Sequence, residues 1–220
     1  MPKRFAFTYP HDVIAEAVKR LSRVKDAEVE RVSRTALAIA VREYLPVALW
    51  CEPSPPEALA EGGEGCVFIS EEGVAFAKAP PLSGAVILRY FTEGRTPEVG
   101  QTLADAEYIS ATQRFTETLR ARHGISIQTV TETKDGDVRY GARDGGEFLV
   151  TRDADLNAIL ENTATLLASE EFSHLRAGSF QYIDLRFGNK IFVKETATPE
   201  SPNEPQAFTP PPKTDDTENP

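Results

Sequence analysis

The sequence is poor in the features that bind nucleic acids or cross membranes. Its 220 residues include 24 Lys and Arg against 34 Asp and Glu, which gives a net charge of −10, and no basic cluster occurs. Because nucleic-acid binding depends on neutralising phosphates with such clusters, we expect no nucleic-acid partner. No run of about 18 apolar residues predicts a membrane span, and no apolar stretch of a secretory signal follows Met1.

The sequence also lacks the patterns of common catalytic and cofactor sites. It contains no phosphate-binding glycine loop, no dinucleotide-binding glycine motif, no His-Glu-x-x-His and no nucleophile elbow. The three histidines, His11, His123 and His174, are far apart along the chain. Asp135 and Asp137 flank a glycine, but the further oxygen ligands of a calcium loop are missing. We therefore expect no catalytic residue, metal, cofactor or small-molecule substrate.

Cysteine is scarce, with only Cys51 and Cys66, each at the edge of an expected strand. The residues between them are rich in Pro, Glu and Gly. A disulfide there would close a loop of about fifteen residues, stabilise the fold by about 3 kcal/mol and require an oxidising compartment. The alternative is two small apolar side chains that never meet. The residues alone leave both possibilities open.

Apolar spacing predicts a helix and a hairpin at the amino end. Residues 12–24 place apolar side chains three and four positions apart, on one helical face. Residues 27–32 and 36–42 alternate between apolar and polar side chains, as paired strands do. The pattern therefore predicts one amphipathic helix followed by two antiparallel strands.

The middle of the chain predicts a β domain with two helices. Strands are expected at residues 46–51, 66–70, 74–76, 85–92, 125–132, 138–142 and 147–151. Helices are expected at residues 102–122, capped by Thr102, and at residues 153–169. Residues 196–220 hold seven of the 16 prolines and few apolar residues, which predicts a disordered tail.

The last predicted strands form a hairpin within residues 179–194, closed by Gly188 and Asn189. A two-residue loop pairs Arg186 with Ile191 and Leu185 with Phe192. One face of this hairpin is then apolar and holds Ile183, Leu185, Phe187 and Phe192. The other face is mixed and holds Tyr182, Asp184, Arg186, Ile191 and Val193. Because no later strand is predicted, we expect an open strand edge, which favours strand addition by another chain.

Three motifs resemble the FtsQ/DivIB family of bacterial cell-division proteins. Val24-Lys-Asp-Ala-Glu-Val-Glu-Arg31 resembles the passage from the second helix of that family's POTRA domain into the next strand. Thr35-Ala-Leu-Ala-Ile-Ala-Val-Arg-Glu43, with Leu45-Pro-Val-Ala48 after it, resembles the family's strand that ends in a Glu-Arg-x-Pro-x-Ala type sequence. Tyr182-Ile-Asp-Leu-Arg-Phe187 is the most specific and is similar to a Tyr-x-Asp-Leu-Arg-Tyr strand near the family's carboxyl end.

The resemblance implies a non-enzymatic scaffold of the division septum at the extracytoplasmic face of the cell membrane. Its partners would be small coiled-coil membrane division proteins of the FtsB, FtsL or DivIC type. The implied docking residues are Tyr182, Asp184, Arg186, Phe187, Lys190, Ile191 and Phe192, with the edge backbone of residues 190–194. For Asp184 and Arg186, a simple ion pair along the strand is the alternative. The implied compartment favours a bridge between Cys51 and Cys66.

Taken together, we expect an α+β protein with a partial POTRA-like domain at residues 1–42. A mixed, mainly antiparallel β domain would occupy residues 43–195, followed by the disordered tail. The family's membrane-spanning helix and the earlier POTRA elements do not precede residue 12, so we expect a truncated amino terminus. Two alternatives stay open: a POTRA-type module in polypeptide transport or envelope assembly, and a small cytosolic enzyme.

Overall fold

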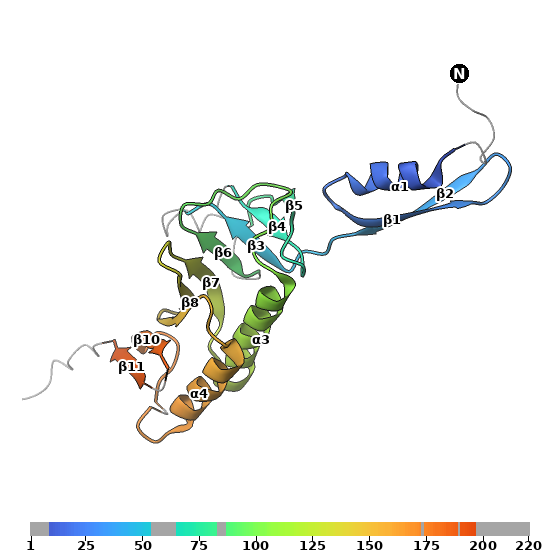
Figure 1. Ribbon diagram of the computed structural model, residues 1–220. Coiled ribbons are helices and arrows are strands. Elements are labelled where there is room, and N and C mark those ends of the chain that lie inside the picture. Colours follow the sequence, from blue (N-terminus) through green and yellow to red (C-terminus); the bar gives the residue numbers. More distant parts are fainter. Residues whose placement is uncertain (1–8, 54–64, 83–86, 173, 189, 197–220) are drawn as a thin grey trace, which may run out of the picture.

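In the part of the chain that the structure describes, a two-stranded sheet and a nine-stranded sheet form. Figure 1 shows how they are arranged. The computed structural model describes residues 9–53, 65–82, 87–172, 174–188 and 190–196. Three helices accompany the sheets in this part of the chain, and the larger sheet is mixed and mainly antiparallel. The predicted α+β fold class is confirmed. The predicted tail lies outside the described residues, apart from Thr196.

The small sheet pairs β1 (Val24–Arg31) with β2 (Leu37–Glu43) in antiparallel fashion, and α1 (His11–Lys19) packs on β1. The helix ends five residues earlier than the apolar spacing predicts. The chain turns after α1, and the N–H of Val24 donates to the carbonyl of Leu21 at 2.8 Å. Val24 is therefore buried as the first residue of a strand, not as the last residue of the helical face.

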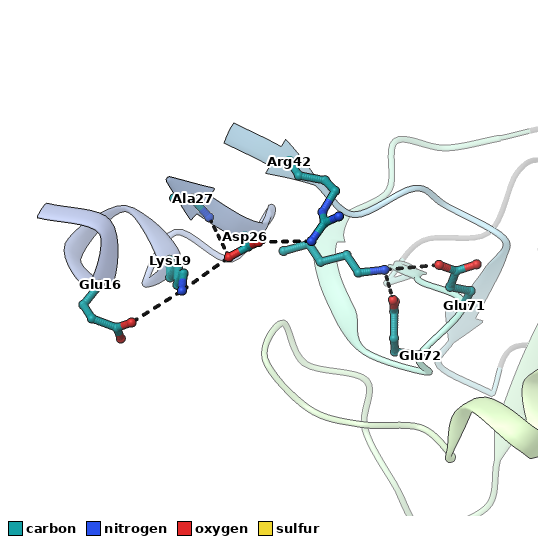
Figure 2. A network of polar contacts seen from close by, with 8 residues as sticks. Glu16, Lys19, Asp26, Ala27, Arg42, Glu71 and Glu72 are labelled. Carbon is teal, nitrogen blue, oxygen red and sulfur yellow. Dashed lines mark hydrogen bonds and ion pairs between the residues drawn. The ribbon is translucent and has the colours of Figure 1, made fainter. Parts of the chain in front are cut away.

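Asp26 connects α1 with both strands of the small sheet (Figure 2). Its Oδ1 lies 3.3 Å from Nζ of Lys19 and accepts a hydrogen bond from the N–H of Ala27 at 3.0 Å. Its Oδ2 accepts a hydrogen bond from Nη2 of Arg42 at 3.0 Å. The hydrogen bonds from Lys19 and Ala27 hold the pKa of Asp26 below its usual range. Lys19 also lies 3.6 Å from Glu16, so the network links neighbouring turns of the helix to the strands.

The small sheet meets the large one through a second polar contact, which Figure 2 shows, and through one ring pair. Lys25 of β1 pairs with Glu71, at 3.2 Å, and with Glu72 in the turn that precedes β5 (Ala75–Lys78). The ring of Tyr44 stacks on that of Phe76, with 5.7 Å between centroids. These contacts set the small sheet against one end of the large one.

The large sheet has the order β11-β10-β9-β8-β7-β6-β3-β4-β5. Its other strands are β3 (Ala48–Cys51), β4 (Val67–Ile69), β6 (Arg89–Thr92), β7 (Ile127–Glu132), β8 (Asp137–Ala142), β9 (Glu147–Thr151), β10 (Phe180–Phe187) and β11 (Lys190–Glu195). The pairs β3–β6, β6–β7 and β9–β10 are parallel, and the remaining pairs are antiparallel. A parallel pair needs a crossover connection, which α4 (Leu156–Ala168) supplies between β9 and β10.

The helices α3 (Ala106–His123) and α4 pack against each other beside the sheet (Figure 1). Phe115 of α3 contacts the rings of Tyr140 and Phe148, at 4.9 and 6.3 Å between centroids. The predicted helix cap at Thr102 is wrong. Asp105 caps α3 by accepting the N–H of Tyr108, whereas Thr102 forms a bridge with Val74, which engages its backbone in the sheet. No helix in the described ranges is long and apolar enough to span a membrane.

A disulfide between Cys51 and Cys66 joins the end of β3 to the residue before β4. Both cysteines are buried in a small apolar cluster with Leu49 and Phe91. The bridge favoured by the resemblance is therefore present, and the alternative of two cysteines that never meet is excluded. The bridge fixes both ends of the connection between β3 and β4.

Candidate partner-binding edge

The two ends of the large sheet differ in how their backbone groups are used. At one end, the N–H of Ala75 in β5 donates to the carbonyl of Gln101 at 2.8 Å, and the carbonyl of Ala75 accepts the N–H of Gly100 at 2.7 Å. Val74 and Thr102 extend this contact. At the other end, β11 pairs with β10 alone among the described residues. The expected open edge is thus found at β11, while β5 is partly covered.

The register of the terminal hairpin differs from the predicted one. Phe187 pairs with Lys190 as expected, and Gly188 has a φ of 64°, as the tight turn requires. Asn189 lies outside the described residues. A bulge then interrupts the ladder, and Asp184, not Leu185, pairs with Phe192. The predicted pairing of Leu185 with Phe192 is therefore wrong.

The bulge consists of Leu185 and Arg186, which together oppose the single residue Ile191. The predicted one-to-one pair of Arg186 with Ile191 is therefore not formed. An extra residue on one strand reverses the direction of the side chains that follow it. Leu185 thereby stays in the core, while Phe187 turns to the opposite face of the sheet.

This reversal redistributes the side chains predicted for each face. Two residues expected on the mixed face pack against the core, namely Ile191 and Val193. Two residues expected on the apolar face are exposed instead, Phe187 at 54% and Phe192 at 51%. The hairpin consequently presents two aromatic rings to solvent beside an open strand edge.

We call Tyr182, Phe187, Lys190, Phe192 and Lys194 the outer hairpin face. The rings of Phe187 and Phe192 meet edge to face, with 5.4 Å between centroids. Nζ of Lys194 lies 6.0 Å from the centre of the Tyr182 ring, within the range of a cation–π contact. A shallow depression on this face is lined by Tyr182, Asp184, Phe187, Lys190 and Phe192.

Arg186 holds Asp184 on this face through two parallel hydrogen bonds. Nε of Arg186 donates to Oδ1 of Asp184 at 2.9 Å and Nη2 donates to Oδ2 at 2.6 Å. The hydrogen bonds from Arg186 hold the pKa of Asp184 below its usual range, although burial acts in the opposite direction. The same contacts raise the pKa of Arg186. The ion pair that the sequence offered as an alternative is therefore present.

Arg186 has a second carboxylate partner that the sequence analysis missed. Nη1 donates to Oδ2 of Asp137 at 2.5 Å. Asp137 is the first residue of β8 and pairs with Thr151 of β9, so the guanidinium reaches over β9. Only the strand order brings these residues together, and no local pattern predicts it.

The predicted docking residues thus fall into three groups. The residues that line the depression are Tyr182, Asp184, Phe187, Lys190 and Phe192. Arg186 supports Asp184 from the side, and Ile191 packs toward the core. Lys194 belongs to the outer hairpin face but was predicted only as edge backbone. Across the described ranges, no three His, Cys, Asp or Glu side chains gather as a metal site would need.

Comparison with known proteins gives this arrangement no family assignment. The chain matches no protein-family model, and no curated protein matches it significantly. The fold and the terminal hairpin therefore define the class of molecule. It is an α+β protein in which, among the described residues, the edge strand β11 is unpaired on one side and lies beside two exposed phenylalanine rings. The resemblance to the FtsQ/DivIB family rests on the sequence motifs alone.

Proposed function

We propose that this chain is a non-enzymatic scaffold that binds another polypeptide by strand addition at β11. The difference between the two ends of the large sheet carries this proposal. Residues 100–102 partly cover β5, whereas β11 pairs only with β10 within the part of the chain that the structure describes. A row of unpaired N–H and C=O groups is a template for a further strand. Phe187 and Phe192 beside that row supply apolar contact area for the same partner.

We further infer a role in the bacterial division septum. This part of the proposal is supported by the resemblance of the Tyr182-Ile-Asp-Leu-Arg-Phe187 strand to the FtsQ/DivIB family. The partners would be small coiled-coil membrane division proteins of the FtsB, FtsL or DivIC type, met at the extracytoplasmic face of the membrane. The disulfide between Cys51 and Cys66 agrees with that compartment, because disulfides persist where the surroundings are oxidising.

In this proposal the two sheets belong to different domains, and the large sheet carries the binding site. Residues 1–42 would be a partial POTRA-like domain, and residues 43–195 would be the β domain that carries the docking strand. Binding needs no metal, cofactor or bond-forming step, so no catalytic residue is assigned. Affinity would come from main-chain hydrogen bonds along β11, and specificity from the side chains on either side of it.

The test is hydrogen exchange of the full chain with and without a partner segment. The partner is the extracytoplasmic segment of an FtsB- or DivIC-type protein from the same genome. We expect binding to slow amide exchange in residues 190–195 and to leave residues 75–78 unchanged. The double variant Phe187→Ser, Phe192→Ser should bind about tenfold more weakly, because two exposed rings leave the contact.

A matched control is Val32→Ser, which changes an exposed apolar residue in the connection directly after β1, far from β11 in the sheet order. We expect this variant to bind like the unchanged chain. Urea midpoints should be similar in all three proteins, since each substituted side chain is at least half exposed. Protection that appears away from residues 190–195, or binding that is indifferent to the double substitution, would overturn the docking proposal.

A further inference from the structure

Along β11, exposed lysine and phenylalanine side chains alternate with branched apolar side chains that pack toward the core. Lys190, Phe192 and Lys194 lie on the outer hairpin face, and the residues between them, Ile191 and Val193, pack toward the core. In a strand, alternate residues share a face and are about 7 Å apart. A strand laid along β11 therefore meets a cation, a ring and a second cation on one face. On its other face it meets two branched apolar side chains.

The two lysines are available to a partner. Neither Lys190 nor Lys194 has a carboxylate partner among the residues that the structure describes. The acid closest to them in the hairpin ladder, Asp184, is already bound by Arg186. Glu195 is held by His174, with 3.0 Å between Oε2 and Nε2. In a chain with a net charge of −10, this leaves a local positive site at the open edge.

The same lysines disfavour a second copy of this chain as the occupant. Two β11 strands paired antiparallel around Phe192 would place Lys190 of one copy opposite Lys194 of the other. Like charges directly opposite each other destabilise a strand pair. Lysines on an edge strand are also a common means of preventing self-association. The charge pattern therefore selects an acidic segment of a different chain.

We propose that the strand bound by β11 carries two acidic residues four positions apart, with an apolar residue midway between them, all on its outer face. The two intervening residues are branched and apolar, and they cover Ile191 and Val193. This inference rests on strand addition as the proposed function and specifies the side chains of the partner. Cross-strand pairs of opposite charge would then form at Lys190 and Lys194, on either side of an apolar contact with Phe192.

The test uses three short synthetic peptides with the full chain at low ionic strength. Their central residues are Glu-Val-Leu-Val-Glu, Gln-Val-Leu-Val-Gln and Lys-Val-Leu-Val-Lys, with identical Thr-rich flanks. Fluorescence anisotropy gives the affinities, and hydrogen exchange locates the bound peptide. We expect the acidic peptide to bind about tenfold more tightly than the neutral one, and the basic peptide to bind most weakly.

Charge reversal on the protein provides the decisive comparison. The double variant Lys190→Glu, Lys194→Glu should prefer the basic peptide over the acidic one. The control is Lys78→Glu, at the end of β5, the edge strand at the opposite end of the sheet order. It should still bind the acidic peptide most tightly and the basic peptide most weakly. Both lysines of β11 are exposed, so the variant is expected to fold, which its urea midpoint checks.

The possible failures point to different conclusions. Equal affinity of the three peptides with protection of residues 190–195 would overturn the charge pattern and leave strand addition standing. If no peptide binds but the coiled-coil segment still protects residues 190–195, the proposed charge pattern is also wrong and strand addition is still supported. If neither the peptides nor that segment protects β11, both this inference and the proposed function are wrong.

Discussion

Arg186 and Asp137 meet across strand β9, with 2.5 Å between Nη1 and Oδ2, although they are 49 residues apart in the sequence. The same guanidinium holds Asp184, which is only 5% exposed. Arg186 thus connects the terminal hairpin to the middle of the large sheet. A substitution of Arg186 therefore changes the fold of the edge as well as its surface, and it is a poor probe of partner contact by itself.

Arg186→Gln should lower the free energy of unfolding by about 1–3 kcal/mol, because it leaves the buried carboxylate of Asp184 without its charged donor. Urea unfolding at neutral pH measures the change. The control is Arg139→Gln, which removes an exposed pair with Glu147 at 3.9 Å and should cost about 0–1 kcal/mol. Equal losses in the two variants would contradict the role assigned to Arg186.

Asp184→Asn should make stability less dependent on pH under acidic conditions. Because the folded pKa of Asp184 is lowered, this carboxylate contributes stability above its unfolded pKa of about 3.9. That contribution is lost as the pH falls through the folded pKa. The stability difference between the unchanged chain and the variant should therefore shrink from about pH 5 downward. A difference that stays constant over this range would refute the assignment.

Removing the disulfide by Cys51→Ala, Cys66→Ala should lower the free energy of unfolding by about 3 kcal/mol, as for a closed loop of about fifteen residues. Urea midpoints with and without a reductant measure the effect. The unchanged chain should respond to the reductant and the double variant should not. If the reductant lowers both midpoints equally, the loss does not come from the bridge.

Gly146→Ala should be more destabilising than Gly136→Ala, although both glycines have positive φ. A Cβ at Gly146 would lie 2.6 Å from a ring carbon of Phe180, whereas a Cβ at Gly136 meets nothing within 4 Å. We expect about 1–2 kcal/mol for Gly136→Ala from the backbone alone. We expect about 1–3 kcal/mol more for Gly146→Ala from the collision. Thermal unfolding of both variants measures the loss of stability. An equal loss in the two variants would contradict the proposed collision with Phe180.

Most elements were predictable because their patterns are local. Residues 147–151 were predicted as a strand with the observed bounds of β9, and the spacing in residues 153–169 predicted α4 within a few residues. The end of α1 was not predictable in this way. Val24 continues the helical spacing but is buried in β1, because the chain turns after Lys19 and tertiary contacts decide where its side chain lies.

The candidate site was predictable in its location and not in its faces. Aromatic and branched residues around Gly188 predicted the hairpin and its position late in the chain. The bulge at Leu185 and Arg186 depends on how the core accepts Leu185, which no pattern within the hairpin encodes. Phe187 and Phe192 were consequently assigned to the wrong face. The contact of Arg186 with Asp137 needed the strand order of the whole sheet.

Residues 100–102, which lie along β5, have a consequence for stoichiometry. Growth of a filament requires two complementary surfaces on each subunit, so that every added copy offers a fresh acceptor. Because Ala75 already uses its backbone groups on Gly100 and Gln101, β5 is a poor acceptor for the β11 of a neighbour. If β11 binds another strand as proposed, the large sheet would accept that one strand and offer no second edge for a further copy, so the product would be a discrete complex and not a fibre.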